Sequence, residues 1–341
     1  MGLFRRRQKP IKIANHKPNG RKTLAGNPEV ILIEASGLSK KFKRNNDHYA
    51  VKDFNISVPA GQMFGLLGPD GAGKTTTLRM LASVMESTSG YAKIAGFDTV
   101  KQMGEARKQI GYMPQNFSLY PDLSVMENLI FFADINGVHG SLRNERIQEM
   151  LAFTRLKDFT SRRAGNLSGG MKKKLALACA MLHKPKVLLL DEPSTGVDPV
   201  SRRELWVILS NIVLDGVTII VSTPYMDEAE RCHQVGILYE GKLLSTGSPS
   251  EMQSQLPYEV IEVNAKPRKV MHQVVDAADY VMGSRTIGDR LRLSVKDPQS
   301  ALLKLERQLN AAGSDIKILR HAKHNMEDVF ITLVEEKRGL N

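Results

Sequence analysis

One short segment, Gly68 to Thr75, limits the folds open to this chain more than any other. It reads Gly-Pro-Asp-Gly-Ala-Gly-Lys-Thr and matches the pattern G-x-x-x-x-G-K-[ST]. The apolar run Phe64 to Leu67 precedes it, and a segment of helical character, Lys74 to Met85, follows it. Glycines let a backbone wrap closely around a phosphate chain, and a helix N-terminus adds about half a positive charge. The segment therefore predicts a phosphate-binding loop between a strand and a helix.

The loop supplies most of the candidate nucleotide-binding residues. Lys74 is expected to reach the β and γ phosphates of a nucleoside triphosphate, and the Thr75 hydroxyl is expected to ligate Mg²⁺. A plain glycine turn is the alternative, which the flanking strand and helix disfavour. The candidate residues are Gly68, Pro69, Asp70, Gly71, Ala72, Gly73, Lys74, Thr75 and Thr76.

Two consecutive acids follow the apolar run Val187 to Leu190, which is short enough to be a buried parallel strand. Ligands of parallel sheets bind at the carboxyl ends of the strands, so the acids and the phosphate loop are expected to meet. Asp191 is then placed to hold Mg²⁺, and Glu192 to orient or deprotonate the water that attacks the γ-phosphate. By itself, the pair would be an ordinary acidic loop.

Short apolar runs alternate with longer stretches of helical period over residues 29–255, which predicts an α/β fold with a largely parallel sheet. Within it, residues 116–165 are expected to form a helical insert. This insert includes a helix from Val125 to Asn136, opened by a capping box of Ser124 and Glu127. A later helix is expected from Met171 to His183. The expected strands include Ile31 to Ile33, Phe64 to Leu67, Val187 to Leu190 and Val217 to Val221.

Residues 256–341 change to a shorter rhythm and predict a small α+β accessory domain. Their pattern is β-α-β-β-α-β-α, which is typical of a ferredoxin-like fold followed by one more helix. Asp297 and Asn325 are expected to begin the last two helices. The expected strands are Tyr258 to Val263, Tyr280 to Thr286, Arg290 to Val295 and Ile316 to Leu319, and the first helix is Pro267 to Ala277.

Basic residues are concentrated at the start of the chain. The sequence holds 48 Lys and Arg against 36 Asp and Glu, a net charge of +12, and residues 1–28 contain no acid. Because this arm has few apolar side chains to offset its ordering entropy, it is predicted to be mostly disordered. It is either a solvated arm or a segment attracted to anionic lipid headgroups or nucleic acid.

The remaining composition, with 42% hydrophobic and 25% charged residues, is that of an ordinary globular protein. No apolar run approaches the roughly 18 residues of a membrane span. The two cysteines are too few for a disulfide framework, so a reducing, cytosolic compartment is expected.

A third motif gives the chain a family resemblance. Leu167-Ser168-Gly169-Gly170-Met171 resembles the signature motif of ATP-binding cassette (ABC) ATPases and lies upstream of the acid pair, as in that family. The resemblance covers about residues 30–250. It implies a P-loop NTPase cassette with a mostly parallel sheet, flanking helices, an antiparallel β part and a helical insert. It also implies that Ser168, Gly169 and Gly170 bind the nucleotide through the start of a helix.

Two further positions match the pattern of this family. Gln115, in Tyr112-Met113-Pro114-Gln115, resembles the glutamine of the loop that joins the sheet to the helical insert. The resemblance implies a catalytic and Mg²⁺-binding role for Gln115. Phe42, after Leu38-Ser39-Lys40-Lys41, resembles the aromatic residue that stacks on adenine, although a lone phenylalanine more often belongs to a core. ATP and Mg²⁺ are the implied cofactors.

Smaller features resemble the bacterial multidrug-type exporters that pair with type-2 export permeases. They are Pro69-Asp70, the helix start at Met171, Tyr225 to Glu230 and the closing Glu327 to Phe330. In that branch two ATPase subunits enclose two ATP molecules, so the resemblance implies a second subunit, either identical or paralogous. It also implies a separate permease, docked near Gln115 to Leu129, and a location on the cytoplasmic face of the bacterial inner membrane.

One position departs from the family. A histidine usually follows the strand equivalent to Thr218 to Ser222 and contacts the γ-phosphate, but this chain has Pro224 there. Proline has no side-chain donor and no N–H, so it cannot replace that contact, and we do not expect His233 to take over the role. We expect Glu192 to suffice for hydrolysis. The alternatives are an ATP-gated regulatory module with little hydrolysis and, less favoured, a soluble cassette protein that acts on nucleic acid.

Overall fold

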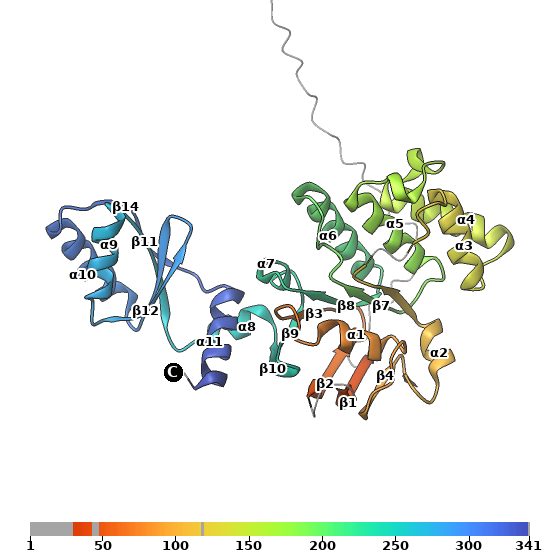
Figure 1. Ribbon diagram of the computed structural model, residues 1–341, viewed down its shortest axis with the longest axis horizontal. Coiled ribbons are helices and arrows are strands. Elements are labelled where there is room, and N and C mark those ends of the chain that lie inside the picture. Colours follow the sequence, from red (N-terminus) through yellow and green to blue (C-terminus); the bar gives the residue numbers. More distant parts are fainter. Residues whose placement is uncertain (1–29, 43–47, 117–118, 340–341) are drawn as a thin grey trace, which may run out of the picture.

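The computed structural model describes residues 30–42, 48–116 and 119–339. The described strands form three sheets, two in the N-terminal body (residues 30–255) and one in the C-terminal unit (residues 256–339). Figure 1 shows these two parts side by side, with the C-terminal unit on the left. The predicted basic arm, residues 1–28, lies outside the described residues.

The central sheet of the N-terminal body confirms the predicted α/β fold. Its strand order is β10-β9-β3-β8-β7-β6, and the pairings are parallel except between β9 and β10. Each residue of β3, β7 and β8 is buried, which explains why these strands read as continuous apolar runs. The strands are β3 (Met63–Leu67), β6 (Ile110–Met113), β7 (Val187–Asp191), β8 (Thr218–Thr223), β9 (Gln234–Tyr239) and β10 (Lys242–Gly247).

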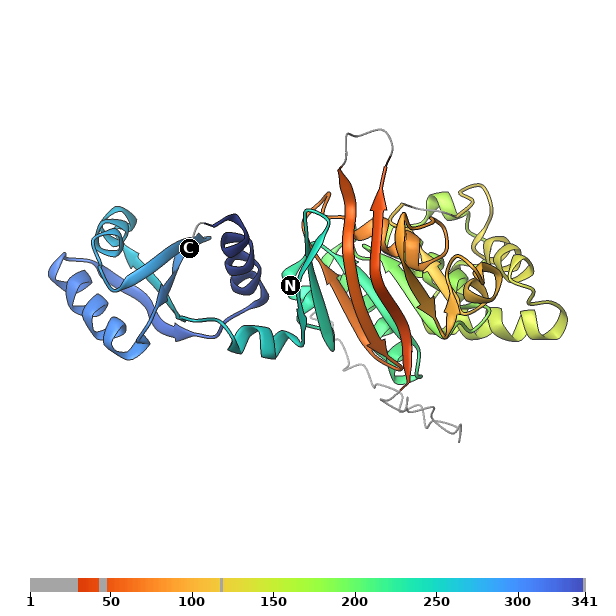
Figure 2. The ribbon, with the colours of Figure 1, turned by 90° about the horizontal axis from the view of Figure 1, so that it is seen from below.

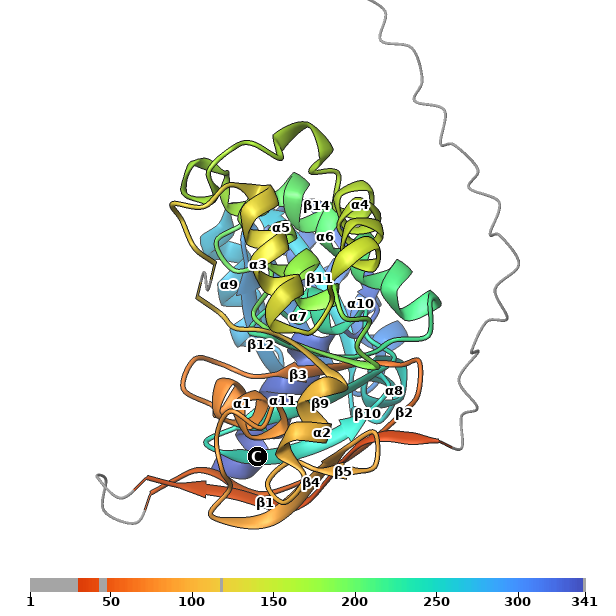
Figure 3. The same ribbon diagram turned by 90° about the vertical axis from the view of Figure 1, so that its right-hand side faces the viewer.

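A second, antiparallel sheet has the order β2-β1-β4-β5 and packs on one face of the central sheet. Side chains alternate between the two faces of β3: Phe64 and Leu66 enter the core shared with the antiparallel sheet, and Met63 and Leu67 enter the core under the helices. Figure 3 shows β1, β4 and β5 on one side of the body and the insert helices on the other. The strands are β1 (Ile31–Lys41), β2 (Tyr49–Pro59), β4 (Ser89–Ile94) and β5 (Phe97–Asp98).

The helices of the N-terminal body follow the predicted pattern with shifted ends: α3 ends at Ile135, one residue before the predicted end, and α5 begins and ends two residues earlier than predicted. Ser124 and Glu127 form the predicted capping box at the start of α3. The helix after the phosphate loop ends at Leu81, four residues before the predicted Met85, because Ser83 takes a left-handed conformation (φ 55°) that ends the helical geometry. The helices are α1 (Lys74–Leu81), α2 (Met103–Lys108), α3 (Val125–Ile135), α4 (Gly140–Thr154), α5 (Gly169–Met181), α6 (Pro199–Leu214), α7 (Met226–Ala229) and α8 (Pro249–Ser254).

The C-terminal unit has the predicted ferredoxin-like topology. Its antiparallel strand order is β12-β13-β11-β14, and α9 and α10 pack on one face through Met271, Val275, Leu305 and Leu309. Asp297 and Asn325 begin the last two helices, as predicted. The elements are β11 (Glu259–Lys266), α9 (Arg268–Asp276), β12 (Val281–Ile287), β13 (Arg290–Val295), α10 (Pro298–Ala311), β14 (Asp315–Ala322) and α11 (Met326–Arg338).

The last helix, α11, returns to the N-terminal body. Met326 and Val329 are buried in the same core as the insert helices, and the Phe330 ring lies edge-on to Tyr239 at 6.2 Å between centroids. Figure 2 shows α11 between the C-terminal sheet and the N-terminal body. The boundary predicted at residue 256 therefore does not separate two independent cores, because the final helix joins the first. Across the described ranges, none of the helices combines the length and the apolar character that crossing a bilayer requires.

Candidate active site

The phosphate loop lies between β3 and α1, as predicted, and close packing requires two of its glycines, Gly68 and Gly73. A Cβ on Gly68 would stand 2.3 Å from the Leu238 carbonyl oxygen, and one on Gly73 would stand 2.4 Å from the Ala50 carbonyl oxygen. Gly73 also has φ 105°, which favours glycine. The strands β9 and β2 thus hold the loop from two sides. Ala72 is buried, whereas the Asp70 side chain is 91% exposed.

Lys74 connects the phosphate loop to the acid pair. Its side chain is only 4% exposed, and its ammonium donates to the carbonyl oxygens of Gly68 (2.9 Å) and Pro69 (3.0 Å). The same nitrogen lies 3.1 Å from Oε1 of Glu192. The sheet therefore brings the predicted phosphate-binding lysine and the predicted catalytic acid, 118 residues apart in sequence, into direct contact.

Asp191 ends β7 and is completely buried beside the start of α1. Its Oδ1 accepts hydrogen bonds from the hydroxyls of Thr75 (3.2 Å) and Ser222 (2.7 Å). Its other oxygen, Oδ2, is buried and has no hydrogen-bond partner among the described residues. A buried carboxylate oxygen without a donor is costly, so this atom is suited to a cation.

These residues fit a magnesium site that the nucleotide completes. Thr75 and Asp191 supply one hydroxyl and one carboxylate, and Mg²⁺ typically takes its remaining ligands from phosphate oxygens and water. Within residues 30–42, 48–116 and 119–339, His, Cys, Asp and Glu side chains form no group of three or more that could hold a metal by themselves. The donor set therefore matches a metal that arrives with its substrate.

Glu192 is held in an unusual backbone conformation. Its φ is 48°, in the left-handed region, which costs roughly 1–2 kcal/mol for a residue with a side chain. Its N–H donates to Ser222 Oγ at 3.0 Å, and its Oε2 accepts from Gln115 Nε2 (2.8 Å) and from the Thr195 hydroxyl (3.2 Å). These contacts offset the strain and aim the carboxylate at Lys74. Gln115, predicted as a catalytic and metal-binding residue, thus contacts the predicted catalytic acid directly.

Three contributors to this site were not among the predicted site residues: Ser222, Thr195 and Lys173. Ser222 pairs with Asp191 in the parallel register of β8 and β7, a pairing that the sequence does not display. Lys173 reaches from α5 to the carbonyl oxygens of Gln115 and Glu192. Burial lowers the pKa of Lys173, an effect that the nearby Asp191 and Glu192 carboxylates oppose.

The Ser168 motif begins α5, as the resemblance implied. The Ser168 hydroxyl accepts from the Met171 N–H at 3.3 Å, and a Cβ on Gly170 would stand 2.5 Å from Ser201 at the start of α6. Gly169 packs beside the Gly196 carbonyl. The glycines therefore let the signature helix approach the loop that follows the acid pair.

The loop after β8, which contains Pro224, is anchored by a buried carboxylate. Glu228 is fully buried, and its oxygens accept from Arg202 Nε (2.6 Å), Trp206 Nε1 (3.0 Å) and the Thr223 hydroxyl (2.6 Å). This anchor ties the loop to α6. His233 accepts the Met63 N–H through Nδ1 at 3.1 Å, at the start of β3.

Phe42 lies at the end of β1 with 43% of its surface exposed. The Lys40 ammonium stands 5.6 Å from its ring centroid. Residues 43–47, which follow it, lie outside the described ranges. Its predicted stacking on adenine stays a prediction.

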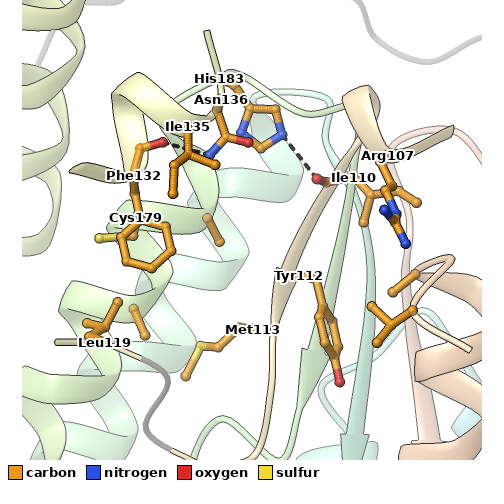
Figure 4. A pocket seen from close by; sticks show the side chains of 14 residues that line it. Arg107, Ile110, Tyr112, Met113, Leu119, Phe132, Ile135, Asn136, Cys179 and His183 are labelled. Carbon is orange, nitrogen blue, oxygen red and sulfur yellow. Dashed lines mark hydrogen bonds between the residues drawn. The ribbon is translucent and has the colours of Figure 1, made fainter. Parts of the chain in front are cut away.

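A cavity of about 300 Å³ opens between β6, α2, α3 and α5 (Figure 4). Its wall includes Tyr112, Leu119, Phe132 and Ile135, and His183 bonds the Ile110 carbonyl at its edge through Nε2 (3.0 Å). Burial raises the pKa of Tyr112 and lowers that of His183, so both groups are neutral near pH 7. Arg107 and Asn136 add polar groups to this lining, and the cavity lies next to the loop that carries Gln115.

A phosphate loop, an acid pair and a Ser-Gly-Gly helix start on this sheet define an ATP-binding cassette. A family model described as ABC transporter matches residues 51–195. Nod factor export ATP-binding protein I of Burkholderia thailandensis is 35% identical over 293 residues, which cover 85% of this chain and 94% of that protein. The probable multidrug ABC transporter ATP-binding protein YbhF of Escherichia coli is 44% identical over 233 residues, 68% of this chain but only 40% of the length of YbhF.

Solved structures of ATP-binding cassettes share this fold. The ATP-binding subunit of an ABC transporter aligns with a TM-score of 0.60 and 29% identity over 66% of this chain and 92% of its own length. A dimeric ATP-binding cassette in a post-hydrolysis state with ADP and phosphate aligns with a TM-score of 0.57 and 25% identity over 64% of this chain and 98% of its own. The chain therefore belongs to the family of ATP-binding proteins of ABC transporters.

Proposed function

We propose that this chain is the ATP-hydrolysing subunit of a bacterial export system. Mg²⁺·ATP would lie between the Gly68 to Thr76 loop and the acid pair of one subunit, facing the Ser168 helix start of a second. One observation carries the proposal: two residues of the phosphate loop contact the acid pair at the carboxyl edge of the central sheet. The Lys74 ammonium lies 3.1 Å from Glu192 Oε1, and the Thr75 hydroxyl lies 3.2 Å from Asp191 Oδ1. Export is supported by the names of the relatives, a multidrug and a Nod factor export protein.

In the proposed reaction, the triphosphate takes the Lys74 ammonium away from Glu192. Lys74 then neutralises phosphate charge, and the released carboxylate accepts a proton from the attacking water. The Gln115 amide, 2.8 Å from Glu192, orients that carboxylate and the water beside it. Bound Mg²⁺ would supply charge stabilisation at the phosphates, held by Thr75 and Asp191. Because Pro224 has no side-chain hydrogen-bond donor, hydrolysis depends on Glu192 and Gln115 in this proposal.

Replacing Asp191 tests the proposed metal site. Asp191→Asn is expected to raise the Mg²⁺ concentration for half-maximal turnover by about 10- to 100-fold. The buried Oδ2, which has no hydrogen-bond donor, is replaced by an uncharged amide oxygen or by an NH₂ group, and both bind a cation less well than a carboxylate oxygen. ATP binding in EDTA should be retained. Turnover is measured against Mg²⁺ at fixed ATP, with Asp158→Asn, an exposed acid, as the control. An unchanged Mg²⁺ requirement would contradict this assignment.

The proposed partner is a permease of the type-2 export class. The cavity of about 300 Å³ in Figure 4 supports a docking place there, because Ile135 (64% exposed) and Val84 (57% exposed) present apolar surface at its rim. A short amphipathic segment of the permease would fill the cavity and contact the loop that carries Gln115. Docking would in this way connect the permease to the catalytic acid.

Ile135→Glu is expected to weaken permease binding by at least about tenfold, because a charge would be buried without a partner in an apolar contact. The measurement is co-purification with a co-expressed type-2 export permease and the stimulation of ATP turnover by that permease. Leu303→Glu on α10, with similar exposure (58%), is the control. Equal binding by both variants would place the permease elsewhere. Loss of ATP affinity in Ile135→Glu would indicate misfolding.

The remaining assignments extend the same proposal. A location on the cytoplasmic face of the inner membrane, through the permease, follows from partnership with a permease. The basic arm would add attraction to anionic lipid, at about 1 kcal/mol per basic residue near the surface. Neither the regulatory module with little hydrolysis nor the nucleic-acid protein receives support from the family or the named relatives.

A further inference from the structure

A lysine of the signature helix reaches into the catalytic edge of the same subunit. Lys173 lies on α5, just past the first turn that Ser168 caps. Its ammonium donates to the main-chain oxygen of Gln115 at 2.8 Å and to that of Glu192 at 3.4 Å. The next lysine, Lys174, instead pairs with Glu204 on α6. These two neighbouring lysines therefore bind different partners, and Lys173 is the one that lies at the proposed reaction site.

The contacts of Lys173 complete a closed arrangement. The side chains of Gln115 and Glu192 are joined by the hydrogen bond from Nε2 to Oε2 at 2.8 Å. Lys173 joins the main chains of the same two residues. Gln115 and Glu192 are thus connected through their side chains and also through their main chains. Together these contacts fix the position of the Gln115 amide relative to the Glu192 carboxylate.

The strain at Glu192 makes this support useful. Its left-handed backbone (φ 48°) persists only if neighbouring groups stabilise it. Ser222 binds the Glu192 N–H at 3.0 Å, and Lys173 approaches the carbonyl of the same residue. The contact of Lys173 with the Glu192 carbonyl is a long hydrogen bond of 3.4 Å, whereas its bond of 2.8 Å to the Gln115 carbonyl has the length of a strong, charge-assisted one.

We propose that Lys173 is a positioning residue for ATP hydrolysis, which holds the Gln115 loop and the Glu192 peptide in register. Through it, the helix that begins at the signature Ser168 is bonded to the acid of its own subunit. The inference rests on the proposed roles of Gln115 and Glu192. It differs from a phosphate-binding role, because both acceptors of Lys173 are main-chain oxygens of the protein.

Turnover and binding of the full-length protein separate these roles. Lys173→Met is expected to lower kcat by about 10- to 100-fold, because loss of the tie displaces the acid and the amide by a fraction of an ångström or more. The Kd for ATP in EDTA should change by less than about twofold, and Lys173→Arg should recover kcat to within about threefold. Lys186→Met, an exposed lysine before β7, is the control. A raised Kd with normal kcat would overturn the proposal.

A double-mutant cycle with Gln115→Ala measures whether the effects of the two substitutions on kcat depend on each other. A merely structural role of Lys173 would not produce this dependence. If Lys173 acts through Gln115, the double variant should be no slower than the slower single variant. Multiplied losses would overturn the proposal, and so would wild-type turnover in Lys173→Met. If Lys173→Met does not fold, the cycle is run with Lys173→Gln. Wild-type turnover in Glu192→Gln would instead refute the proposed function itself.

Discussion

Glu192→Gln is expected to lower kcat for ATP hydrolysis by about 10²- to 10³-fold, since the amide cannot accept a proton from water. Glutamine has nearly the same shape as glutamate, and its one side-chain oxygen can still accept hydrogen bonds from Gln115 and Thr195. In the wild-type structure these donors lie 2.8 and 3.2 Å from Glu192 Oε2. The local structure should therefore persist. Phosphate release under saturating Mg²⁺·ATP measures the effect.

The same substitution should tighten ATP binding by about fivefold, or about 1 kcal/mol. In the structure the Lys74 ammonium lies 3.1 Å from Glu192 Oε1, and both side chains are almost completely buried. The triphosphate must replace this contact with its own. Removing the negative charge makes Lys74 easier to recruit, and equilibrium binding in EDTA reports the change without hydrolysis.

Glu105→Gln is the matched control, because this acid pairs with a lysine on the surface (Lys108, 2.7 Å). It should leave both kcat and Kd within about twofold of the wild type. Turnover of Glu192→Gln at the wild-type rate would remove the acid from the proposed reaction. Weaker ATP binding would instead contradict the role of the Lys74 contact.

Glu228→Ala is expected to lower the free energy of unfolding of the N-terminal body by about 3–5 kcal/mol. Glu228 is fully buried and accepts three hydrogen bonds, from Arg202, Trp206 and Thr223. Truncation leaves a buried indole N–H, a hydroxyl and part of a guanidinium without their acceptor. Trp206, the one tryptophan of the sequence, lies in this network, so its fluorescence during urea denaturation reports the loss directly.

Asp227→Asn provides the control, because Arg202 also binds this neighbouring acid, at 2.8 Å. The Asp227 side chain is 65% exposed, so solvent screens the pair and the expected cost is at most about 1 kcal/mol. The two substitutions thus remove a carboxylate charge from the same arginine at different burial. Equal losses of stability would contradict the buried anchor, and a loss of activity confined to Glu228→Ala would connect it to the Pro224 loop.

The sequence predicted those parts of the site that depend on neighbouring residues. The phosphate loop, the acids at the end of β7 and the helix caps at Ser124 and Asn325 all follow from patterns a few residues long. A cap needs only a side chain and an amide three positions away, so its geometry is local. The helix after the phosphate loop departed most from its predicted length, because a left-handed Ser83 ended it early.

The partners of the acids could not be predicted in this way. Ser222 meets Asp191 only because β8 lies beside β7 in parallel register. Lys173 meets Gln115 across 58 positions of sequence, through the packing of α5 against the edge of the sheet. No periodicity encodes such contacts, since they depend on strand order and on how far each helix end reaches.

The amino-acid order alone determined the phosphate-loop motif between a strand and a helix, the acids that stand opposite it, and the ferredoxin-like unit that follows. Only the tertiary structure decided that Lys74 rests on Glu192, that Lys173 supports the glutamine loop, and that α11 returns to the first core. The reason is physical. Local conformation reflects interactions over about four residues, whereas these contacts form when distant segments bury their apolar faces together and place polar groups side by side.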